Sequence, residues 1–321
     1  MALAALCLLA GWPLKAQNFN QLEEKTLPVG EFHSVSATDN FEITLERGAC
    51  SVTVTADQQL SPYVQVYVRS KVLYVTYDEK SVPKDIRKLY KGRNAPTPVF
   101  RVAVTLPALS GLYLSENVNV TAKDTFESNR LDLTLADKAQ VKNLTVRGTA
   151  ATVNLRKNTQ AVLELQMDSS LEMSTEGNAI LKADVQAKDL AVSAAGSSQL
   201  SLSARQTGTA TLRCAGSSKL AFMGEVDKMD LQAAASADVA LNGSAQTFLL
   251  KAEKNADVDA NAFPVQRLEA DMSGSSRAEV NVVETLSATL VGGSALYYSG
   301  TPVFRIGKIM KSTLAPYGTS K

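Results

Sequence analysis

The residues able to do chemistry are few in this sequence, and they are scattered along it. His33 is the only histidine, and after the first sixteen residues the only cysteines are Cys50 and Cys214. The common zinc sites need four cysteine or histidine ligands, so the sequence predicts no metal and no cofactor. The two cysteines either form a disulfide in an oxidising compartment or remain as buried thiols. We favour two thiols, because cysteine packs well as a small apolar side chain.

Serine pairs recur at 197–198, 217–218 and 275–276, each directly after a glycine. They are not nucleophile elbows, because the second glycine of the Gly-x-Ser-x-Gly motif is missing. A stack of such pairs would offer hydroxyls to a glycan, but we favour small residues that fit a tight corner. Glycoside cleavage needs two carboxylates facing each other across a cleft. Asp and Glu instead stand singly along the chain, so the sequence predicts no active site.

A basic run lies between Pro83 and Pro96. Its basic side chains are Lys84, Arg87, Lys88, Lys91 and Arg93, against one acidic residue, Asp85. Such a run can contact an anionic envelope polymer or a lipid headgroup. The interpretation that we favour is a solvated excursion with one helical turn.

The elements that hold these residues form a repeat with a period of about 20 residues, typical of a solenoid. Ala195–Leu202, Ala215–Phe222 and Ser273–Val280 share one pattern, in which small residues and a turn precede an alternating strand. The residue at the glycine of this pattern recurs in steps of 19 to 21: Glu116, Asp137, Asn158, Gly177, Gly196, Gly216, Ala235, Lys254, Gly274 and Gly293. We expect these positions to be turns, with Gly177, Gly196, Gly216, Gly274 and Gly293 supplying positive φ at low cost.

An apolar or aromatic residue stands four places after each of these ten turns, from Val120 to Tyr297 and including Val162. Around the turns, apolar and polar residues alternate with period two, which indicates strands. A coil this short cannot bury its own apolar face, so neighbouring coils must stack. The sequence therefore predicts an all-β fold, a parallel β-helix or solenoid with coils of about 19–21 residues and an N-terminal β cap.

The rest of the chain is divided around this repeat. We expect residues 1–16 to be a signal peptide, because an apolar stretch of about ten residues is too short to span a bilayer. Residues 17–30 are expected as a linker. Residues 31–105 are expected to open the solenoid and cover its first edge, with the basic insertion at 83–96. Residues 106–302 are the repetitive β-helix, and residues 303–321 a C-terminal capping tail.

Composition limits the partners. Without residues 1–16 the chain has 32 basic and 32 acidic side chains, since only Lys15 is removed. Nucleic acid is not an expected partner, because phosphate binding needs a basic field. No later segment has about 18 uninterrupted apolar residues, so the sequence predicts no transmembrane segment.

The sequence resembles the bacterial family of the auto-transporter adhesin, head GIN domain, over roughly residues 30–303. The resemblance rests on Phe32–Ser36 leading into Phe41–Leu45, a Leu-Pro-x-Leu segment at Leu106–Leu109, the repeated Ser-Gly-Ser-Ser turns, and Tyr-Tyr-x-Gly-x-Pro at Tyr297–Pro302. It implies a right-handed parallel β-helix that is secreted or associated with the envelope. It supplies no functional residues.

These observations favour a non-catalytic, exported module located in the periplasm, at the outer cell surface or in the medium. Its expected role is adhesin-like, either binding or structural, with a glycan or an envelope protein as partner. A polysaccharide lyase or hydrolase built on a β-helix is the alternative, and an envelope-stress signalling accessory is the second. Coils this uniform leave almost no room for the long loops that build a catalytic cleft, and this disfavours the enzyme.

Overall fold

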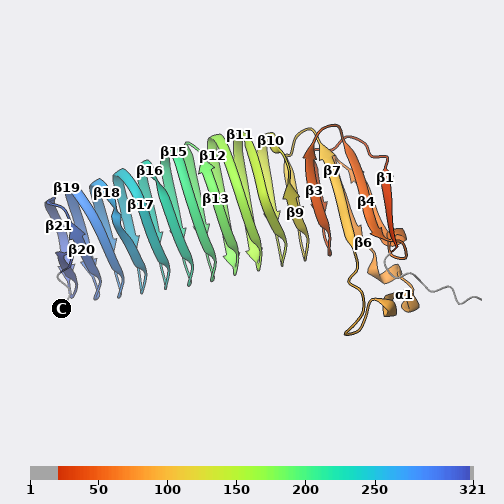
Figure 1. Cartoon of the computed structure of the whole chain (residues 1–321). Helices are drawn as coiled ribbons and strands as arrows, with labels where there is room; N and C mark the ends of the chain where they lie inside the picture. Colours follow the sequence, from red (N-terminus) through yellow and green to blue (C-terminus); the bar gives the residue numbers. More distant parts are fainter. Residues whose placement is uncertain (1–20, 319–321) are drawn as a thin grey trace, which may run out of the picture.

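The structure, a computed structural model, describes residues 21–318. With 68% of the chain in strands and 4% in helices the fold is all-β, and its stacked coils form a solenoid of about 10 turns, which confirms the predicted fold class. Figure 1 shows the coils side by side in one elongated row, with the N-terminal elements at one end and β21 at the other.

Each regular coil has two arms. In β15 (Gln199–Cys214), residues 199–205 pair with β13 (Ile180–Gln186), whereas residues 209–214 pair with β14 (Asp189–Ala194). Both pairings are parallel, and one long strand therefore covers both arms of its coil. We call the arm that follows the tight turn the first arm, and the arm that leads into the next turn the second arm.

The other solenoid strands repeat this arrangement with parallel neighbours. They are β8 (Gly111–Leu114), β9 (Asn119–Ala122), β10 (Thr125–Leu135), β11 (Gln140–Lys157), β12 (Gln160–Gly177), β16 (Lys219–Ala233), β17 (Asp238–Ala252), β18 (Asp257–Met272), β19 (Arg277–Val291), β20 (Ala295–Ser299), β21 (Val303–Met310) and β22 (Thr313–Pro316).

The tight turns form a column of residues with positive φ. They are Asp39, Glu116, Asp137, Lys157, Gly177, Gly196, Gly216, Ala235, Lys254, Gly274, Gly292 and Lys311. The residue after a turn donates its N–H to the turn residue of the preceding coil, as Ser197 does to Gly177 at 2.8 Å and Ser217 to Gly196 at 2.7 Å. This ladder satisfies backbone groups that strand pairing alone would leave free.

Two turns lie one residue earlier than the sequence pattern predicts. Lys157, not Asn158, has the positive φ, and Gly292 continues the column although Gly293 also has a positive φ. The earlier turn positions also change which residues, four places after each turn, point into the interior. Val162 is 46% exposed, whereas Ala161, four places after Lys157, is 2% exposed, and Leu296 has the same place after Gly292 and is fully buried.

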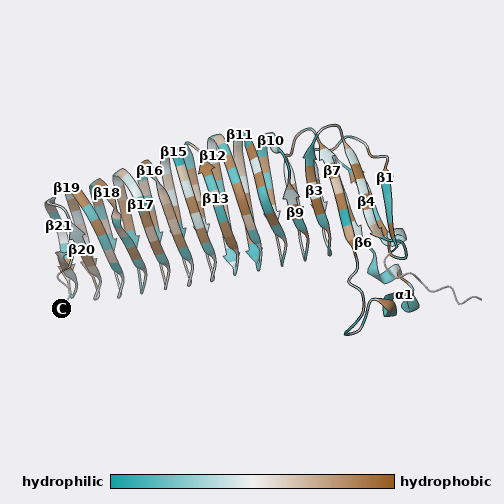
Figure 2. Ribbon diagram, in the orientation of Figure 1, coloured by the Kyte–Doolittle hydropathy of each residue, from teal (hydrophilic) through white to brown (hydrophobic). Residues whose placement is uncertain are grey.

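The interior of the solenoid is filled by one continuous apolar cluster that includes residues of every coil. Figure 2 shows the resulting alternation of hydrophobic and hydrophilic residues along the strands. The second serine of each Ser pair lies inside: Ser198, Ser218 and Ser276 are at most 1% exposed. These hydroxyls fit the corner, whereas the first serine of each pair, Ser197, Ser217 and Ser275, is exposed. Half of each pair is therefore a corner residue, and the other half faces solvent.

The N-terminal region joins the solenoid by parallel pairing and adds antiparallel strands to it. Its strands are β1 (Leu22–Leu27), β2 (Ser34–Ala37), β3 (Glu42–Arg47), β4 (Ser51–Asp57), β5 (Val64–Arg69), β6 (Val72–Tyr77) and β7 (Phe100–Leu106). β2 pairs in parallel with β8, and β3 pairs in parallel with β9, which makes them a coil of the stack. The antiparallel pairs are β1–β4, β4–β7 and β5–β6.

The segment between β6 and β7 contains the basic insertion. It holds the 3-10 turn η2 (Glu79–Ser81) and the short helix α1 (Lys84–Leu89), while a further 3-10 turn, η1 (Ser61–Tyr63), precedes β5. In Figure 1 this segment projects from the N-terminal end of the row. None of the helices among residues 21–318 is long and apolar enough to cross a membrane.

Both ends differ from the expected division of the chain. Residues 22–27 are not a linker, because β1 pairs with β4 from Leu22 opposite Asp57 to Leu27 opposite Val52. Residues 303–316 repeat the coil: β21 pairs with β19 and β22 with β20, and Lys311 takes the turn position. The expected signal peptide, residues 1–16, lies outside the described residues.

Candidate functional site

The glycines singled out by the sequence act on the backbone of the turn column. Gly177, Gly196, Gly216 and Gly274 have φ between 73° and 77°. A Cβ atom on Gly216 would lie 2.7 Å from the carbonyl oxygen of Gly196, closer than a carbon atom can stand without movement of the backbone. These residues allow the coils to approach each other, so their role is in the backbone of the turn column.

The five basic residues of the insertion do not form one surface patch. Arg87 is half-buried and, with the exposed Lys91, lines a hollow between the insertion and the solenoid. Lys84, Lys88 and Arg93 are exposed and do not line that hollow. The structure therefore divides the predicted basic patch into two residues that face a pocket and three that face solvent.

We call the hollow beneath the insertion the cap pocket. It consists of two adjoining cavities of about 240 and 440 Å³. Its principal polar side chains are Asp39, Asn40, Glu42, Glu79, Arg87, Lys91, Arg101, Glu116, Asn117 and Asn119, and its rings are Tyr77, Tyr90, Pro98 and Phe100. The residues come from turns, strands and the insertion, so several distant segments build it.

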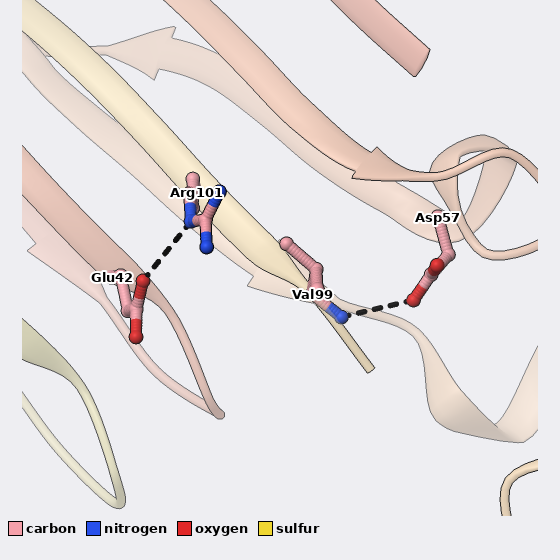
Figure 3. Close-up of polar contacts among 4 residues, drawn as sticks. All are labelled: Glu42, Asp57, Val99 and Arg101. Carbon is pink, nitrogen blue, oxygen red and sulfur yellow. Dashed lines mark hydrogen bonds and ion pairs between the residues drawn. The ribbon is translucent and has the colours of Figure 1, made fainter. Parts of the chain in front are cut away.

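Backbone and side-chain bonds fix the walls of the cap pocket. Figure 3 shows the ion pair between Arg101 Nε and Glu42 Oε2, at 3.2 Å, on the facing strands β7 and β3. It also shows Asp57, a buried carboxylate at the end of β4, which accepts a hydrogen bond from the N–H of Val99 at 2.9 Å. This bond anchors the chain where it returns from the insertion into β7.

The two tyrosines of the cap pocket, Tyr77 and Tyr90, keep their hydroxyl protons at neutral pH. Burial, and then the nearby charge of Glu79, raises the pKa of Tyr77 to about 12. Burial also raises the pKa of Tyr90, with the charge of Asp57 as the second cause. Tyr77 packs on Phe100 with 4.7 Å between ring centroids. At neutral pH both tyrosines are therefore neutral and able to donate a hydrogen bond.

A second hollow runs along the outer surface of the first arms from β12 to β18, and we call it the arm groove. It consists of three adjoining cavities of about 600, 440 and 190 Å³. Small outward residues form its floor, among them Ser201, Ala221 and Ala240. Lys182, Asp184, Arg205 and Asp259 supply charges, and Ile180 and Met223 supply exposed apolar side chains.

Neither hollow holds the groups of a metal site. Among residues 21–318, no three His, Cys, Asp or Glu side chains are grouped so as to hold a metal ion. Both cysteines there are free thiols, with Cys50 half-buried and Cys214 buried. Burial raises the pKa of Cys214 to about 12, so its thiol is unreactive at neutral pH. What the two hollows offer is a set of neutral and charged contacts for binding.

The uniform, stacked coils define a class of protein, the β-solenoid. The chain belongs to the family described as "Putative auto-transporter adhesin, head GIN domain", whose model matches residues 31–217 and 162–302. This confirms the family resemblance of the sequence. The family and the solved structures that resemble the chain are named as adhesins or binding proteins.

Three solved structures illustrate the comparison. A protein from Parabacteroides merdae titled "putative adhesin" is 17% identical, with 92% of this chain and 95% of that chain covered and a TM-score of 0.35. A protein from Parabacteroides distasonis with the same title is 18% identical, with 92% and 97% covered and a TM-score of 0.37. A protein from Parabacteroides distasonis titled as lipid binding is 16% identical, with 92% and 96% covered and a TM-score of 0.34. Among curated proteins, none matches this chain.

Sequence reasoning missed most residues of both hollows. Asn40 and Asn117 each follow a turn residue and lie 77 positions apart, and they meet because β2 and β8 are neighbours. One signal was present for the arm groove. Met223 stands at an outward position of β16, where the alternation calls for a polar residue, and it is 55% exposed.

Proposed function

We propose that this protein is a non-catalytic, adhesin-like binding module of the cell envelope, exported through its N-terminal apolar segment, and that it holds an extended polymer in the arm groove. The observation that carries the proposal is the continuity of the groove. It crosses the first arms of successive coils from β12 to β18 and is lined by strand residues and by the bulged residue Ala262.

The repeat of the coils favours a repeating ligand. Neighbouring strands lie about 4.8 Å apart, so equivalent side chains recur at that spacing along the groove. Ser201, Ala221 and Ala240 occupy equivalent positions on consecutive coils, because Ser201 pairs with Ala221 and Ala221 with Ala240. Many weak contacts at regular intervals add up only for a ligand that spans them, such as a polysaccharide.

The same arrangement disfavours an enzyme. Acid–base chemistry needs a donor and an acceptor of protons that converge on one bond. In the arm groove, Glu164 on β12 and Asp184 on β13 are direct neighbours, whereas Asp238 and Asp259 lie on β17 and β18. All four are exposed, outward residues of the first arms, so they stand on one face of the sheet and not on opposite sides of a cleft, as glycoside cleavage requires.

The test is to fill the groove. Ala221→Arg and Ala240→Arg each place a long side chain on the floor, and binding of purified protein to envelope polysaccharide should fall at least tenfold. Ala191→Arg is the matched control, since Ala191 is an outward alanine on the second arm, in β14. Unchanged binding by both groove variants would overturn the site, and release of shortened product from the bound polysaccharide would overturn the non-catalytic role.

The export proposal has its own test. Cell fractionation with surface protease shaving should recover the protein from the envelope or the medium with residues 1–16 removed. Recovery from the cytosol with an intact N-terminus would contradict export and would leave the binding test unaffected.

A further inference from the structure

The cap pocket has a chemical character different from that of the arm groove. Amide, guanidinium, ammonium, carboxylate and phenol groups line it together, next to the face of a proline and three aromatic rings. Asn117 Nδ2 donates to Asn40 Oδ1 at 2.7 Å and so joins two distant segments of the pocket, and Asn119 Nδ2 donates to the carbonyl oxygen of Asn117 at 3.1 Å within one segment. Each paired amide still has a second polar atom, a donor on Asn40 and an acceptor on Asn117.

Both donors and acceptors line this pocket. Lys91 and Arg87 can only donate hydrogen bonds, whereas the ionised carboxylates of Glu79 and Glu116 can only accept them. A hydroxyl group does both through a single oxygen atom, and a sugar carries several hydroxyls on adjacent carbons. A lining with both kinds of group therefore matches a polyol better than it matches any singly charged group.

We propose that the cap pocket is a binding site for a neutral sugar unit of an oligosaccharide, with Asn40, Asn117, Arg87 and Lys91 bonding its hydroxyls and the ring of Tyr90 contacting its apolar face. The insertion between β6 and β7 supplies one wall of the site, and the turns after β2 and β8 supply the other.

Charge argues against an anion or a cation as the ligand. Asp39, Glu42, Glu79 and Glu116 face Arg87, Lys91 and Arg101 across the two cavities. Glu42 and Arg101 pair with each other, which leaves three carboxylates and two cations. A phosphate or a uronate would meet repulsion from the carboxylates, and the cations would repel a metal ion.

Strand pairing argues against a peptide. An extended peptide usually binds by adding a strand to a free sheet edge. β3, which contributes Glu42 to the pocket, pairs with β7 on one side and with β9 on the other. The backbone hydrogen bonds of this wall are already made, so only side chains are available to a ligand.

Besides polar groups, a sugar site needs an aromatic surface for the apolar face of the sugar, and the rings of the cap pocket supply it. Tyr90 is half-buried, and Tyr77 packs at a tilt against Phe100, which in turn contacts Phe41 with 5.5 Å between centroids. Such a supported aromatic wall loses little conformational freedom when it contacts the C–H face of a sugar ring. Each tyrosine also has a hydroxyl that can donate a hydrogen bond beside that contact.

The experiment separates this site from the arm groove. Purified protein is applied to an array of neutral and acidic oligosaccharides, and the strongest neutral binder is then titrated by calorimetry. We expect Asn117→Ala and Tyr90→Ala each to weaken that binding at least tenfold. Lys88→Ala is the matched control: Lys88 lies in the same insertion as Tyr90, is exposed and is outside the pocket, so its loss should change the affinity less than twofold.

Three results would overturn the proposal. The first is an array on which no neutral oligosaccharide binds. The second is preferential binding of acidic oligosaccharides that Lys88→Ala weakens as much as Asn117→Ala, which would indicate a basic surface. The third is neutral-sugar binding that Ala221→Arg abolishes and Asn117→Ala leaves intact, which would assign the sugar to the arm groove and support the proposed function alone. Circular dichroism that matches the unsubstituted protein establishes that each variant is folded.

Discussion

Cys214 ends β15 with its side chain inside the solenoid, where it is 2% exposed. Its burial raises the pKa of the thiol from 9.0 to about 12. In the unfolded chain the Cys214 thiol ionises near its ordinary pKa, whereas in the folded chain it remains protonated to a higher pH. The contribution of this thiol to the free energy of unfolding is therefore fully present below about pH 9 and is lost as the pH rises toward 12.

This residue gives a prediction of pH dependence. The loss should approach about 4 kcal/mol over the full window, because one pKa unit corresponds to about 1.4 kcal/mol. Urea unfolding between pH 8 and pH 11 covers about two of these three pH units and should show a decline of about 3 kcal/mol from this thiol. Cys214→Ala should show a smaller decline over the same range. An equal decline in both proteins would mean that other groups cause it. Thiol labelling at pH 8 should modify Cys50 and leave Cys214 unmodified until the protein unfolds.

At the scale of the element, β18 carries the largest departure from the regular coil. Its pairing with β19 shifts between Ala260 and Pro264, so extra residues bulge from the strand. Phe263 fills the space that this bulge creates. It is fully buried and makes edge-to-face contacts with Phe222 and Phe248, with 6.5 and 6.1 Å between ring centroids.

Removal of this ring should therefore be costly. Phe263→Ala is expected to lower the free energy of unfolding by about 3–5 kcal/mol, since it deletes a buried aromatic side chain and leaves a cavity. Phe304→Ala is the control, because Phe304 lies on the last coil and is 43% exposed. Chemical denaturation should show the smaller loss for Phe304→Ala, and equal losses would contradict a core role for Phe263.

The elements also show what the sequence can and cannot predict. The alternation and the turn spacing predict the stacked coils, because each coil must bury the same face. They misplace one turn at Asn158, because asparagine tolerates positive φ better than lysine does. The pairing of β11 with β12, in which Lys157 lies opposite Gly177, instead places the turn at Lys157. The cap pocket and the arm groove were not predictable, because each depends on which outward residues become neighbours after stacking.

At the scale of the molecule, strand pairing joins each solenoid coil to its immediate neighbours, so stability is approximately a sum of local and interface contributions. The contact of Phe263 with Phe222, two coils away, is an exception at the bulge. The interior coils have two neighbours, and the terminal ones have one. The last coil exposes Val303, Phe304, Ile306, Ile309 and Met310, each by at least 43%. Its strand has an irregularity at Gly307 and carries Arg305 and Lys308, features that discourage pairing with another edge.

This one-sided packing predicts a gradient of protection. Amide hydrogen exchange followed by mass spectrometry should be slowest in β11 to β17 and fastest in β1, β5, β21 and β22. Every one of these strands is hydrogen-bonded, so secondary structure alone would make their rates similar. A uniform rate along the chain would show that the solenoid opens as one unit and would contradict the additive view.

The turn column has a consequence for how the length of such chains can change in evolution. The backbone bonds of each turn link it to the turns of the two neighbouring coils, with about 20 residues between successive turns. A duplicated or deleted segment of one full period therefore leaves every other junction intact. Genes for such chains can therefore vary in length in whole-coil increments under weak selection, whereas a change of a few residues within a coil shifts the register and is selected against. The N-terminal region, with its insertion and its non-repeating pocket, cannot gain or lose a whole coil in this way, and its length should be the same among related chains.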